Sequence, residues 1–563
     1  MKFQHNALTM AILASSLVVL TACSSPKTHK NEVAVMPTPM VEISPEPEVS
    51  YAAEAVAPAP AAMQAKRVMV QPQMMRAASV TSAKEVAYVE PNTEKYQKNT
   101  PNPVQQVSQN PVSTFSIDVD TGSYSNIRRY LNNGRLPPVH AVRLEEVLNY
   151  FNYQYPQPKD NKPFAVHINT FDSPWKSQAK LIKVAIQAKD IQSKQLPPAN
   201  LVFLVDVSGS MDSEDKLPLV KKTLRILTEQ LRPEDKVTII TYASGEKLEL
   251  EPTSGKEKDK ILAVINRLQA QGATSGERAI QMAYQQAEKA FVKDGINRIL
   301  LATDGDFNVG ITDFDTLKGM VAEKRKSGIS LTTLGFGQGN YNEQLMEQLA
   351  DAGDGNYSYI DNEKEAKKVL QRQLSSTLAT VAQDVKIQVE FNPNTVKEYR
   401  LIGYENRALK QEDFNNDKVD AGDIGAGHQV TAFYEIIPTG VQGWLDESRY
   451  QSQNSSSNDT KNNEYGLFKL RYKLPNQSNS QLIETPILKS SKAFNQADQD
   501  TQFAVATIAY AEQLRGGQYN ANMNWNDILK LAQNNSGNDP HGLRAEFVEL
   551  VKIAKSLSSN KEK

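Results

Sequence analysis

Histidine and cysteine, which hold many catalytic metals, are scarce in this chain of 563 residues. There are six histidines and one cysteine, and the histidines lack the His-x-x-His and His-Glu-x-x-His spacings of zinc enzymes. The P-loop motif Gly-x-x-x-x-Gly-Lys-[Ser/Thr] is absent. Gly-x-Ser-x-Gly does not occur at Ser208, because Asp206 stands where the first glycine is needed. These absences disfavour a zinc enzyme, a nucleotide-hydrolysing P-loop enzyme and a serine hydrolase.

The chain also lacks an excess of either charge. Its 63 basic and 65 acidic residues give a net charge of -2. A nucleic-acid-binding protein normally has a basic surplus or a basic stripe, so no nucleic-acid partner is expected. The hydrophobic fraction of 39% supports globular folding, and the length predicts roughly two to four domains.

The single cysteine is placed where a lipid anchor is attached in secreted proteins. Lys2 is followed by a mostly apolar run and then by Leu20-Thr21-Ala22-Cys23, which predicts a signal peptide over residues 1–22. Leu-Thr-Ala-Cys resembles the lipobox of bacterial lipoproteins. The resemblance implies cleavage before Cys23, lipidation of Cys23 and a membrane-anchored protein of the bacterial cell envelope. The serines at 24 and 25 resemble the signal for outer-membrane sorting; the alternative is an ordinary signal peptide with an incidental cysteine.

Residues 23–110 are rich in Pro and Ala and show no sustained apolar period, so we expect a disordered tether. Residues 111–198 predict an N-terminal α+β region. Two helical patterns precede the strand patterns PFAVHINTFDSPW and KLIKVAIQAKDI.

Residues 199–380 alternate between near-continuous apolar strands and amphipathic helices. The strands include LVFLVDV, KVTIITYAS, NRILLATDGD and ISLTTLGFG. This alternation predicts a Rossmann-like, doubly wound parallel sheet, whose ligand site lies beyond the carboxyl ends of the strands.

Residues 381–475 return to the period of two and predict a β-rich domain, and residues 476–563 predict a helical region. The strands on the two sides of the α/β domain, about 163–192 and 384–474, have matching periods. We therefore hypothesise that they form one sandwich into which the α/β domain is inserted.

Oxygen-bearing side chains follow the strands of the predicted parallel sheet. Asp206, Ser208 and Ser210 lie at alternate positions where LVFLVDV ends. Thr274 lies in a loop between Gly272 and Gly276, and Asp304 follows NRILLAT. An oxygen-only ligand set suits a hard cation such as Mg²⁺, Ca²⁺ or Mn²⁺. The alternative is that Asp206 and the serines only cap a helix.

Asp-x-Ser-x-Ser, the later threonine and Thr-Asp-Gly together resemble the von Willebrand factor type A (vWA) domain, with its metal-ion-dependent adhesion site (MIDAS). The resemblance implies that Ser208, Ser210 and Thr274 supply hydroxyls to the metal, whereas Asp206 and Asp304 act through water or hydrogen bonds. The whole plan also resembles a family of uncharacterised bacterial lipoproteins that contain a vWA domain.

The resemblance implies a non-enzymatic adhesion or assembly module. Hydroxyl ligands leave the charge of the metal poorly neutralised, so its open position favours an Asp or Glu carboxylate of a protein partner. No nearby His or Lys suggests a general base that would activate metal-bound water.

Two other functions are open. Asp118 and Asp120 follow a strand, as the paired acids of a metal-dependent phosphatase do, with Asp118 as nucleophile. That motif, however, has Thr or Val at the position of Gly122 and opens its parallel sheet. The second alternative is a periplasmic scaffold in which the metal is incidental.

Overall fold

The computed structural model describes residues 92–561, except 160–161, 192–195, 275, 306–313, 373–379, 447–460, 476, 491 and 521. All described residues fall within one unit of the chain, 87–563. The predicted signal peptide, Cys23 and most of the predicted tether lie outside the described residues. No helix among the described residues has the length and apolarity needed to cross a membrane.

A six-stranded sheet forms the α/β domain, in the order β10-β9-β8-β5-β6-β7. Its neighbours pair in parallel except β7, which is antiparallel to β6. The predicted doubly wound sheet is therefore confirmed, with an antiparallel edge strand in addition. The strands are β5 (Ala199–Asp206), β6 (Lys236–Tyr242), β7 (Glu246–Ser254), β8 (Ile296–Thr303), β9 (Ser330–Gly335) and β10 (Tyr357–Tyr359).

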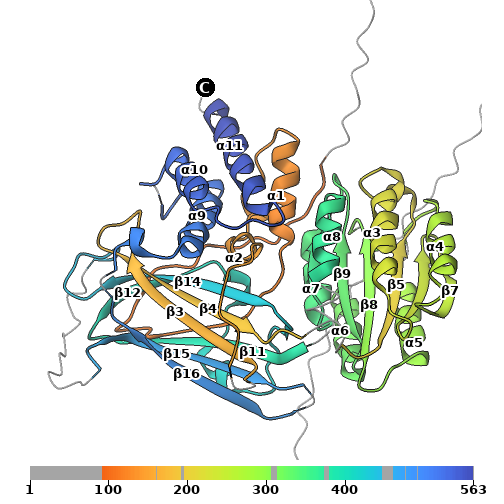
Figure 1. The fold of residues 1–563 in the computed structure, drawn as a ribbon, viewed down its shortest axis with the longest axis horizontal. Helices are drawn as coiled ribbons and strands as arrows, with labels where there is room; N and C mark the ends of the chain where they lie inside the picture. The colour runs from red at the N-terminus through yellow and green to blue at the C-terminus, as the bar shows by residue number, and fades with distance from the viewer. Residues whose placement is uncertain are drawn as a thin grey trace, which may run out of the picture. The chain divides into compact units, whose positions relative to one another are not determined.

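Helices cover both faces of this sheet (Figure 1). Alternate residues of β5 enter different cores: Phe203 packs with α3, α4 and α8, whereas Val202 and Leu204 pack with α5, α6 and α7. Burial on both faces explains why the strand is apolar throughout. The helices are α3 (Leu217–Gln230), α4 (Lys258–Arg267), α5 (Glu277–Lys289), α6 (Phe314–Lys324), α7 (Glu343–Ala352) and α8 (Glu363–Arg372).

Outside the α/β domain, two antiparallel sheets pack against each other and share one core. The first has the order β1-β12-β14-β4-β3, and the second β13-β11-β15-β16, with β2 paired to β11. β4 precedes the α/β domain in sequence and pairs with β14, which follows it, over eight positions. The hypothesis of one sandwich with an inserted α/β domain is thus confirmed. The strands are β1 (Gln105–Gln106), β2 (Val112–Ser116), β3 (Phe164–Asp172), β4 (Lys180–Ala188), β11 (Thr380–Phe391), β12 (Val396–Ile402), β13 (Ile424–Gly425), β14 (Gln429–Pro438), β15 (Glu464–Lys473) and β16 (Ser480–Leu488).

A helical layer covers the sandwich and draws on both ends of the described chain. Phe151 of the N-terminal region contacts Phe503 and Phe547 with ring centroids 5.0 and 5.5 Å apart. The predicted C-terminal helices therefore complete the core of the N-terminal region. The helices are α1 (Gly122–Asn132), α2 (Leu144–Asn149), α9 (Gln499–Leu514), α10 (Trp525–Asn534) and α11 (Leu543–Lys561).

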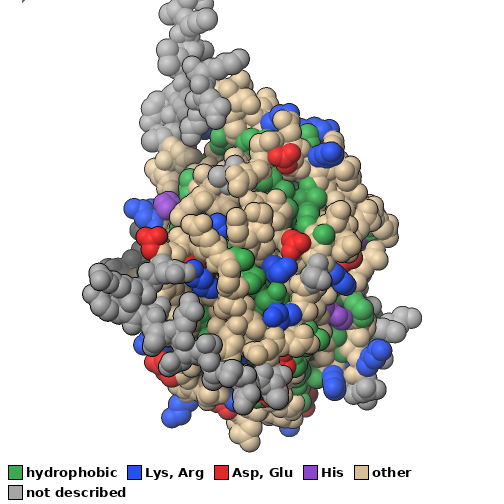
Figure 2. Space-filling model, turned by 90° about the vertical axis from the view of Figure 1, so that its left-hand side faces the viewer, with side chains coloured by type: hydrophobic (Ala, Val, Ile, Leu, Met, Phe, Trp, Pro, Cys, Tyr) green, Lys and Arg blue, Asp and Glu red, His purple; other side chains and the backbone are tan. Residues whose placement is uncertain are grey.

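Some boundaries differ from the expected ones. The tether was expected to reach residue 110, but β1 pairs with β12 and Val107 is buried. β16 lies in the region expected to be helical, because its residues pair with β15. Figure 2 shows one face of the molecule, on which basic and acidic side chains are interspersed rather than gathered in one patch.

Candidate functional site

Asp206 is the last residue of β5, at the carboxyl edge of the parallel sheet. Its side chain is fully buried. The amide of Ser208 donates to Asp206 Oδ1, and the hydroxyl of Thr303 donates to Asp206 Oδ2, each at 2.9 Å. β5 and β8 pair in parallel register up to Val205 and Ala302. Both strands therefore end together, which brings Asp206 next to the Thr-Asp-Gly turn that follows β8.

The two serines join Asp206 to Asp304. Ser208 is buried, whereas Ser210 is exposed at the start of the short 3-10 helix Gly209–Asp212. The Oγ atoms of Ser208 and Ser210 are 3.1 Å apart. Ser210 Oγ donates to Asp304 Oδ2 at 2.9 Å. Four of the five predicted residues thus form one hydrogen-bonded network that reaches the surface.

Thr274, the fifth predicted residue, is buried in the neighbouring loop. This loop is joined to the serine turn, because the amide of Gly209 donates to the carbonyl oxygen of Gly272 at 2.9 Å. A positive φ of 81° at Gly272 lets the loop make this turn. Ser275 lies outside the described residues. Thr274 thus belongs to a loop that contacts the serine turn, but the structure shows no hydrogen bond that joins it to the other four residues.

Two acidic side chains are buried close together here. Burial, and then the charge of Asp304, raise the pKa of Asp206 to about 6, although hydrogen bonds from Ser208 and Thr303 oppose the rise. Two carboxylates in such a place need a compensating positive charge. Part of that positive charge comes from Lys216, which the sequence patterns did not indicate.

Lys216 and Asn340 complete the site. Lys216 Nζ donates to Asp304 Oδ2 at 3.0 Å and to Asn340 Oδ1 at 3.0 Å, and Asn340 Nδ2 donates to Asp304 Oδ2 at 3.0 Å. The sequence suggested no nearby lysine with a role in the chemistry. Lys216 is in fact part of the site, but it acts as a donor to Asp304. Lys216 lies ten residues after Asp206, and Asn340 belongs to no motif, so only the fold reveals their roles.

The donor set fits a hard divalent cation. Hydroxyl and carboxylate oxygens converge, and nitrogen or sulfur ligands are not among the five predicted residues. Within the described part of the chain, no three His, Cys, Asp or Glu side chains are grouped so that they could hold a metal ion. A metal held here would therefore depend on the hydroxyls of Ser208, Ser210 and Thr274, and it would share Asp304 with Lys216.

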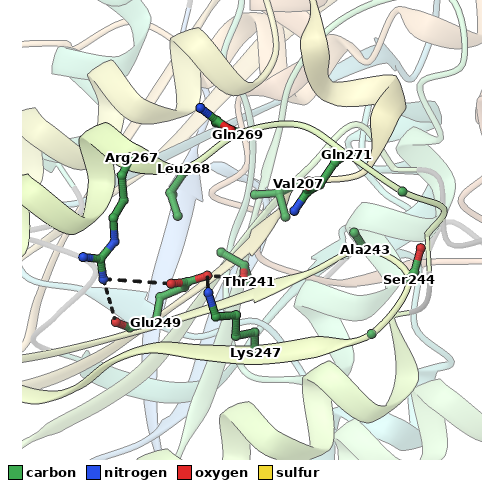
Figure 3. Close-up of a pocket in the computed structure, with 12 residues that line it drawn as sticks. Val207, Thr241, Ala243, Ser244, Lys247, Glu249, Arg267, Leu268, Gln269 and Gln271 are labelled. Atoms are coloured by element: carbon green, nitrogen blue, oxygen red, sulfur yellow. Dashed lines mark hydrogen bonds and ion pairs between the residues drawn. The ribbon is translucent and has the colours of Figure 1, made fainter.

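A pocket of about 480 Å³ opens beside these loops (Figure 3). Val207, Leu268 and Ala243 give it an apolar part. Its polar part holds Glu249, which accepts from Lys247 Nζ at 2.8 Å and lies 4.0 Å from Arg267 Nη2. The lining also includes Gly272, next to the loop of Thr274. The pocket thus adjoins the candidate metal site.

Asp118 and Asp120 do not form a phosphatase site. The strand before them, β2, belongs to the antiparallel sandwich and pairs with β11. Both acids are buried, and each lies 3.2 Å from the guanidinium of Arg407. Asp118 also accepts from the amide of Asp120, and Asp120 from the amide of Tyr357, each at 2.9 Å. Their oxygens serve to hold the turn before α1 against the α/β domain.

Comparison with known families agrees with this architecture. The family model of the von Willebrand factor type A domain matches residues 200–373. A model described as von Willebrand factor matches residues 90–183, and the model of the C-terminal part of the uncharacterized protein YfbK matches residues 376–557. The protein is thus one that contains a vWA domain with a Rossmann-like parallel sheet. Domains of this type generally mediate protein–protein interactions, and most are not enzymes.

The uncharacterized protein YfbK of Escherichia coli (strain K12) is 47% identical over 500 residues, which are 87% of this chain and 86% of that protein. The chain therefore belongs to the YfbK family. The uncharacterized protein sll0103 of Synechocystis is 31% identical over 36% of this chain and 46% of its own length. Human inter-alpha-trypsin inhibitor heavy chain H4 is 28% identical over 36% of this chain and 22% of its own length.

Solved structures resemble the chain more distantly. The von Willebrand factor type A protein from Catenulispora acidiphila is 14% identical, with 68% of this chain and 89% of that chain covered and a TM-score of 0.37. The manganese-loaded TRAP protein of Plasmodium vivax is 19% identical, with 38% of this chain and 92% of that chain covered and a TM-score of 0.28.

Proposed function

We propose that the vWA domain binds a divalent cation, Mg²⁺ or alternatively Ca²⁺ or Mn²⁺, and through it captures an acidic group of a protein partner. The observation that supports the proposal most is the network that joins Asp206, Ser208, Ser210 and Asp304 at the carboxyl edge of the sheet. When bound, the metal supplies a Lewis-acidic position for a carboxylate oxygen. Ser208, Ser210 and Thr274 would hold it, and Asp206 and Asp304 would orient the hydroxyls.

The pocket beside the site supports an acidic partner. Lys247 and Arg267 are 70% and 61% exposed, whereas the Glu249 carboxylate between them is 13% exposed. Two exposed cations and one partly covered carboxylate attract negative charge. A partner bound through one carboxylate would place its neighbouring residues over this pocket.

The sequence at Cys23 supports a lipid anchor in the cell envelope, in the outer membrane. Anchoring and lipidation are tested by replacing Cys23 with serine and following the protein in fractionated cells. The unaltered chain should remain in the membrane fraction and carry an acylated N-terminal residue by mass spectrometry. The variant should lack the acyl group and leave the outer-membrane fraction, and its retention in that fraction would contradict the anchor.

Calorimetric titration tests the metal site. The full chain from residue 23, with Cys23→Ser, should bind one Mg²⁺ or Mn²⁺, and the Ser208→Ala and Ser210→Ala variants should bind at least tenfold more weakly, as is usual for lost ligands or their supports. Ser213→Ala is the matched control, because Ser213 is exposed nearby and donates to Asp215. Absence of binding to the unaltered chain would refute the metal site.

Partner capture needs a separate experiment. Crosslinking in intact cells, with and without a chelator, should give a crosslinked protein that disappears with the chelator and in the Ser208→Ala variant.

A scaffold that needs no metal is the second candidate, and Lys216 is the observation that favours it. Its ammonium already neutralises part of the charge of Asp304. A crosslinked partner that persists in the Ser208→Ala and Asp304→Ala variants would support the scaffold over adhesion.

A further inference from the structure

We infer that residues 93–97, here named the strap, position Asn340 at the candidate metal site, so that docking of the strap and occupancy of the site are coupled. The inference deepens the proposed function and depends on it only for the metal measurement. It assigns positioning roles to Glu94 and Asn340, neither of which belongs to the sequence motif.

The strap pairs with the site loop, which we define as residues 337–342, between β9 and α7. The amide of Thr93 donates to the carbonyl oxygen of Gly339 at 2.7 Å, and the amide of Lys95 donates to that of Tyr341 at 2.9 Å. The amide of Glu343 returns a bond to the carbonyl oxygen of Lys95 at 3.0 Å. Lys95 and Asn342 form a parallel β-bridge. The strap therefore fixes the backbone of the loop on both sides of Asn340.

Glu94 anchors this pairing with a buried side chain. Its carboxylate is 2% exposed and accepts from Arg129 Nη1 and Nη2 at 2.7 and 2.9 Å. The hydroxyl of Tyr96 donates to Oε2 at 2.6 Å. Burial alone would raise the pKa of Glu94, but Arg129 and the tyrosine hydroxyls outweigh it and lower the pKa to about 2. Glu94 is thus a charged anchor that joins the strap to α1.

The same carboxylate reaches the site loop. The amide of Gly339 donates to Glu94 Oε1 at 2.8 Å, and Gly339 has a φ of 92°, which favours glycine. The next residue is Asn340, whose side chain contacts both Asp304 and Lys216 at 3.0 Å. A single peptide unit therefore separates the anchor from the group that orients Asp304.

The site loop also packs against the side chain of Lys216. A Cβ atom at Gly337, where φ is 77°, would lie 2.4 Å from Lys216 Cε, so the loop packs closely over the lysine stem. The side chains that surround Asn340 are the ones that set the charge at the site. If the strap leaves, Gly339 loses three hydrogen bonds, two that its carbonyl oxygen accepts from Thr93 and one that its amide donates to Glu94, and Asn340 is free to move away from Asp304.

Coupling of this kind is reciprocal, because a strap that favours metal binding must itself be favoured by bound metal. Groups that orient metal ligands usually change metal affinity by about 10- to 100-fold when they are removed. We therefore expect Asn340→Ala to weaken Mn²⁺ binding about tenfold. Glu94→Ala should weaken it by a smaller factor, of about three- to tenfold, since Asn340 itself remains.

The test uses the full chain from residue 23 with Cys23→Ser, and Mn²⁺ as the probe. Calorimetry measures the Mn²⁺ affinity of Glu94→Ala, Asn340→Ala and Thr93→Pro; the last removes the amide and hydroxyl donors of Thr93 and leaves Glu94 in place. Glu398→Ala is the matched control. Glu398 is a buried acid on β12 that accepts from the amide of Trp444 at 2.7 Å. It should leave the Mn²⁺ affinity unchanged.

Hydrogen exchange of the metal-free protein gives a readout that needs no metal. Glu94→Ala should speed exchange of the amides in both the strap and the site loop, whereas Glu398→Ala should not. In the unaltered chain, Mn²⁺ should slow exchange in the strap. Glu94→Asp, which keeps the charge, should restore part of the Mn²⁺ affinity.

The outcomes separate this inference from the proposed function. If the strap opens in Glu94→Ala but exchange of the site loop is unchanged, the inference is wrong, whether or not the chain binds metal. If the chain binds no metal, the metal-site proposal fails, and faster exchange of the site loop would still support the strap's positioning role. Faster loop exchange with an unchanged Mn²⁺ affinity would overturn the coupling.

Discussion

Lys216 Nζ lies 3.0 Å from Asp304 Oδ2, inside the set of residues that is expected to hold a metal. Both side chains are at most 9% exposed. A divalent cation at this site would need the carboxylate of Asp304, and the ammonium of Lys216 already contacts that carboxylate. If the site binds a metal as proposed, Lys216 competes with that metal for Asp304.

Lys216→Met should bind Mg²⁺ or Mn²⁺ at least tenfold more tightly, because the variant removes a like charge from beside the metal. The metal-free variant should be less stable by about 3 kcal/mol, since the buried carboxylate of Asp304 loses the positive charge of Lys216. Calorimetry and urea unfolding in a chelator measure the two effects. The control is Lys222→Met, on the exposed face of α3, which begins directly after Lys216. Unchanged affinity in Lys216→Met would show that the lysine does not oppose the metal.

Glu145 should make the stability of the protein depend on pH. Burial, followed by the charges of Glu405 and Asp118, raises the pKa of Glu145 from 4.5 to about 7. The folded state therefore holds a proton that the unfolded state releases between these values. The resulting stabilisation is complete below pH 4.5 and is lost as the pH rises through 7.

Urea unfolding at several pH values checks this expectation. Between pH 5 and 8 the free energy of unfolding of the unaltered chain should fall by on the order of 3 kcal/mol more than that of Glu145→Gln. Glu412→Gln, at an exposed position, should follow the unaltered chain. Parallel pH profiles for Glu145→Gln and the unaltered chain would contradict the assignment.

Arg407 should be essential for the joint between the sandwich and the α/β domain. It pairs with Asp118 and Asp120 on one side and with Glu347 of α7 on the other, at 3.2, 3.2 and 3.3 Å. Arg407→Met leaves the buried acids Asp118 and Asp120 without their cation, whereas Glu347 keeps Arg143, and it should cost about 3–5 kcal/mol in the free energy of unfolding. Arg225→Met, on the exposed face of α3, should cost less than about 0.5 kcal/mol. Urea unfolding distinguishes the two; equal costs would show that the joint does not depend on Arg407.

Phe547 is expected to stabilise the packing of the helical layer. Its ring contacts those of Phe151, Phe503 and Tyr510, with centroids 5.0 to 5.5 Å apart. Phe547→Ala should therefore destabilise the N-terminal region by about 3–5 kcal/mol. Hydrogen exchange in α2 would show the effect directly. Phe291→Ala, at a residue that is 44% exposed, should change little. If α2 keeps its protection in Phe547→Ala, the two ends of the chain fold independently.

The candidate site was predictable where its residues follow strands. The apolar run over β5 predicts a central parallel strand, and Asp206 and Ser208 follow from its end. Lys216 and Asn340 were not predictable, because they reach Asp304 from a helix start and from a loop that no motif marks. The strap was misassigned to the tether for a similar reason. Its residues have little apolar character, and their order comes from backbone pairing and from Glu94.

The sequence by itself determined the α/β domain, the positions of its main strands along the chain and the oxygen-bearing residues at their ends, because each of these depends on local period and composition. Only the tertiary structure decided that β4 and β14 share a sheet across the inserted domain, and that α11 completes the core around Phe151. It also decided that a lysine and an asparagine stand beside Asp304. Such contacts join residues more than a hundred positions apart or depend on the path of a loop, and no local pattern records which distant surface will bury a given side chain.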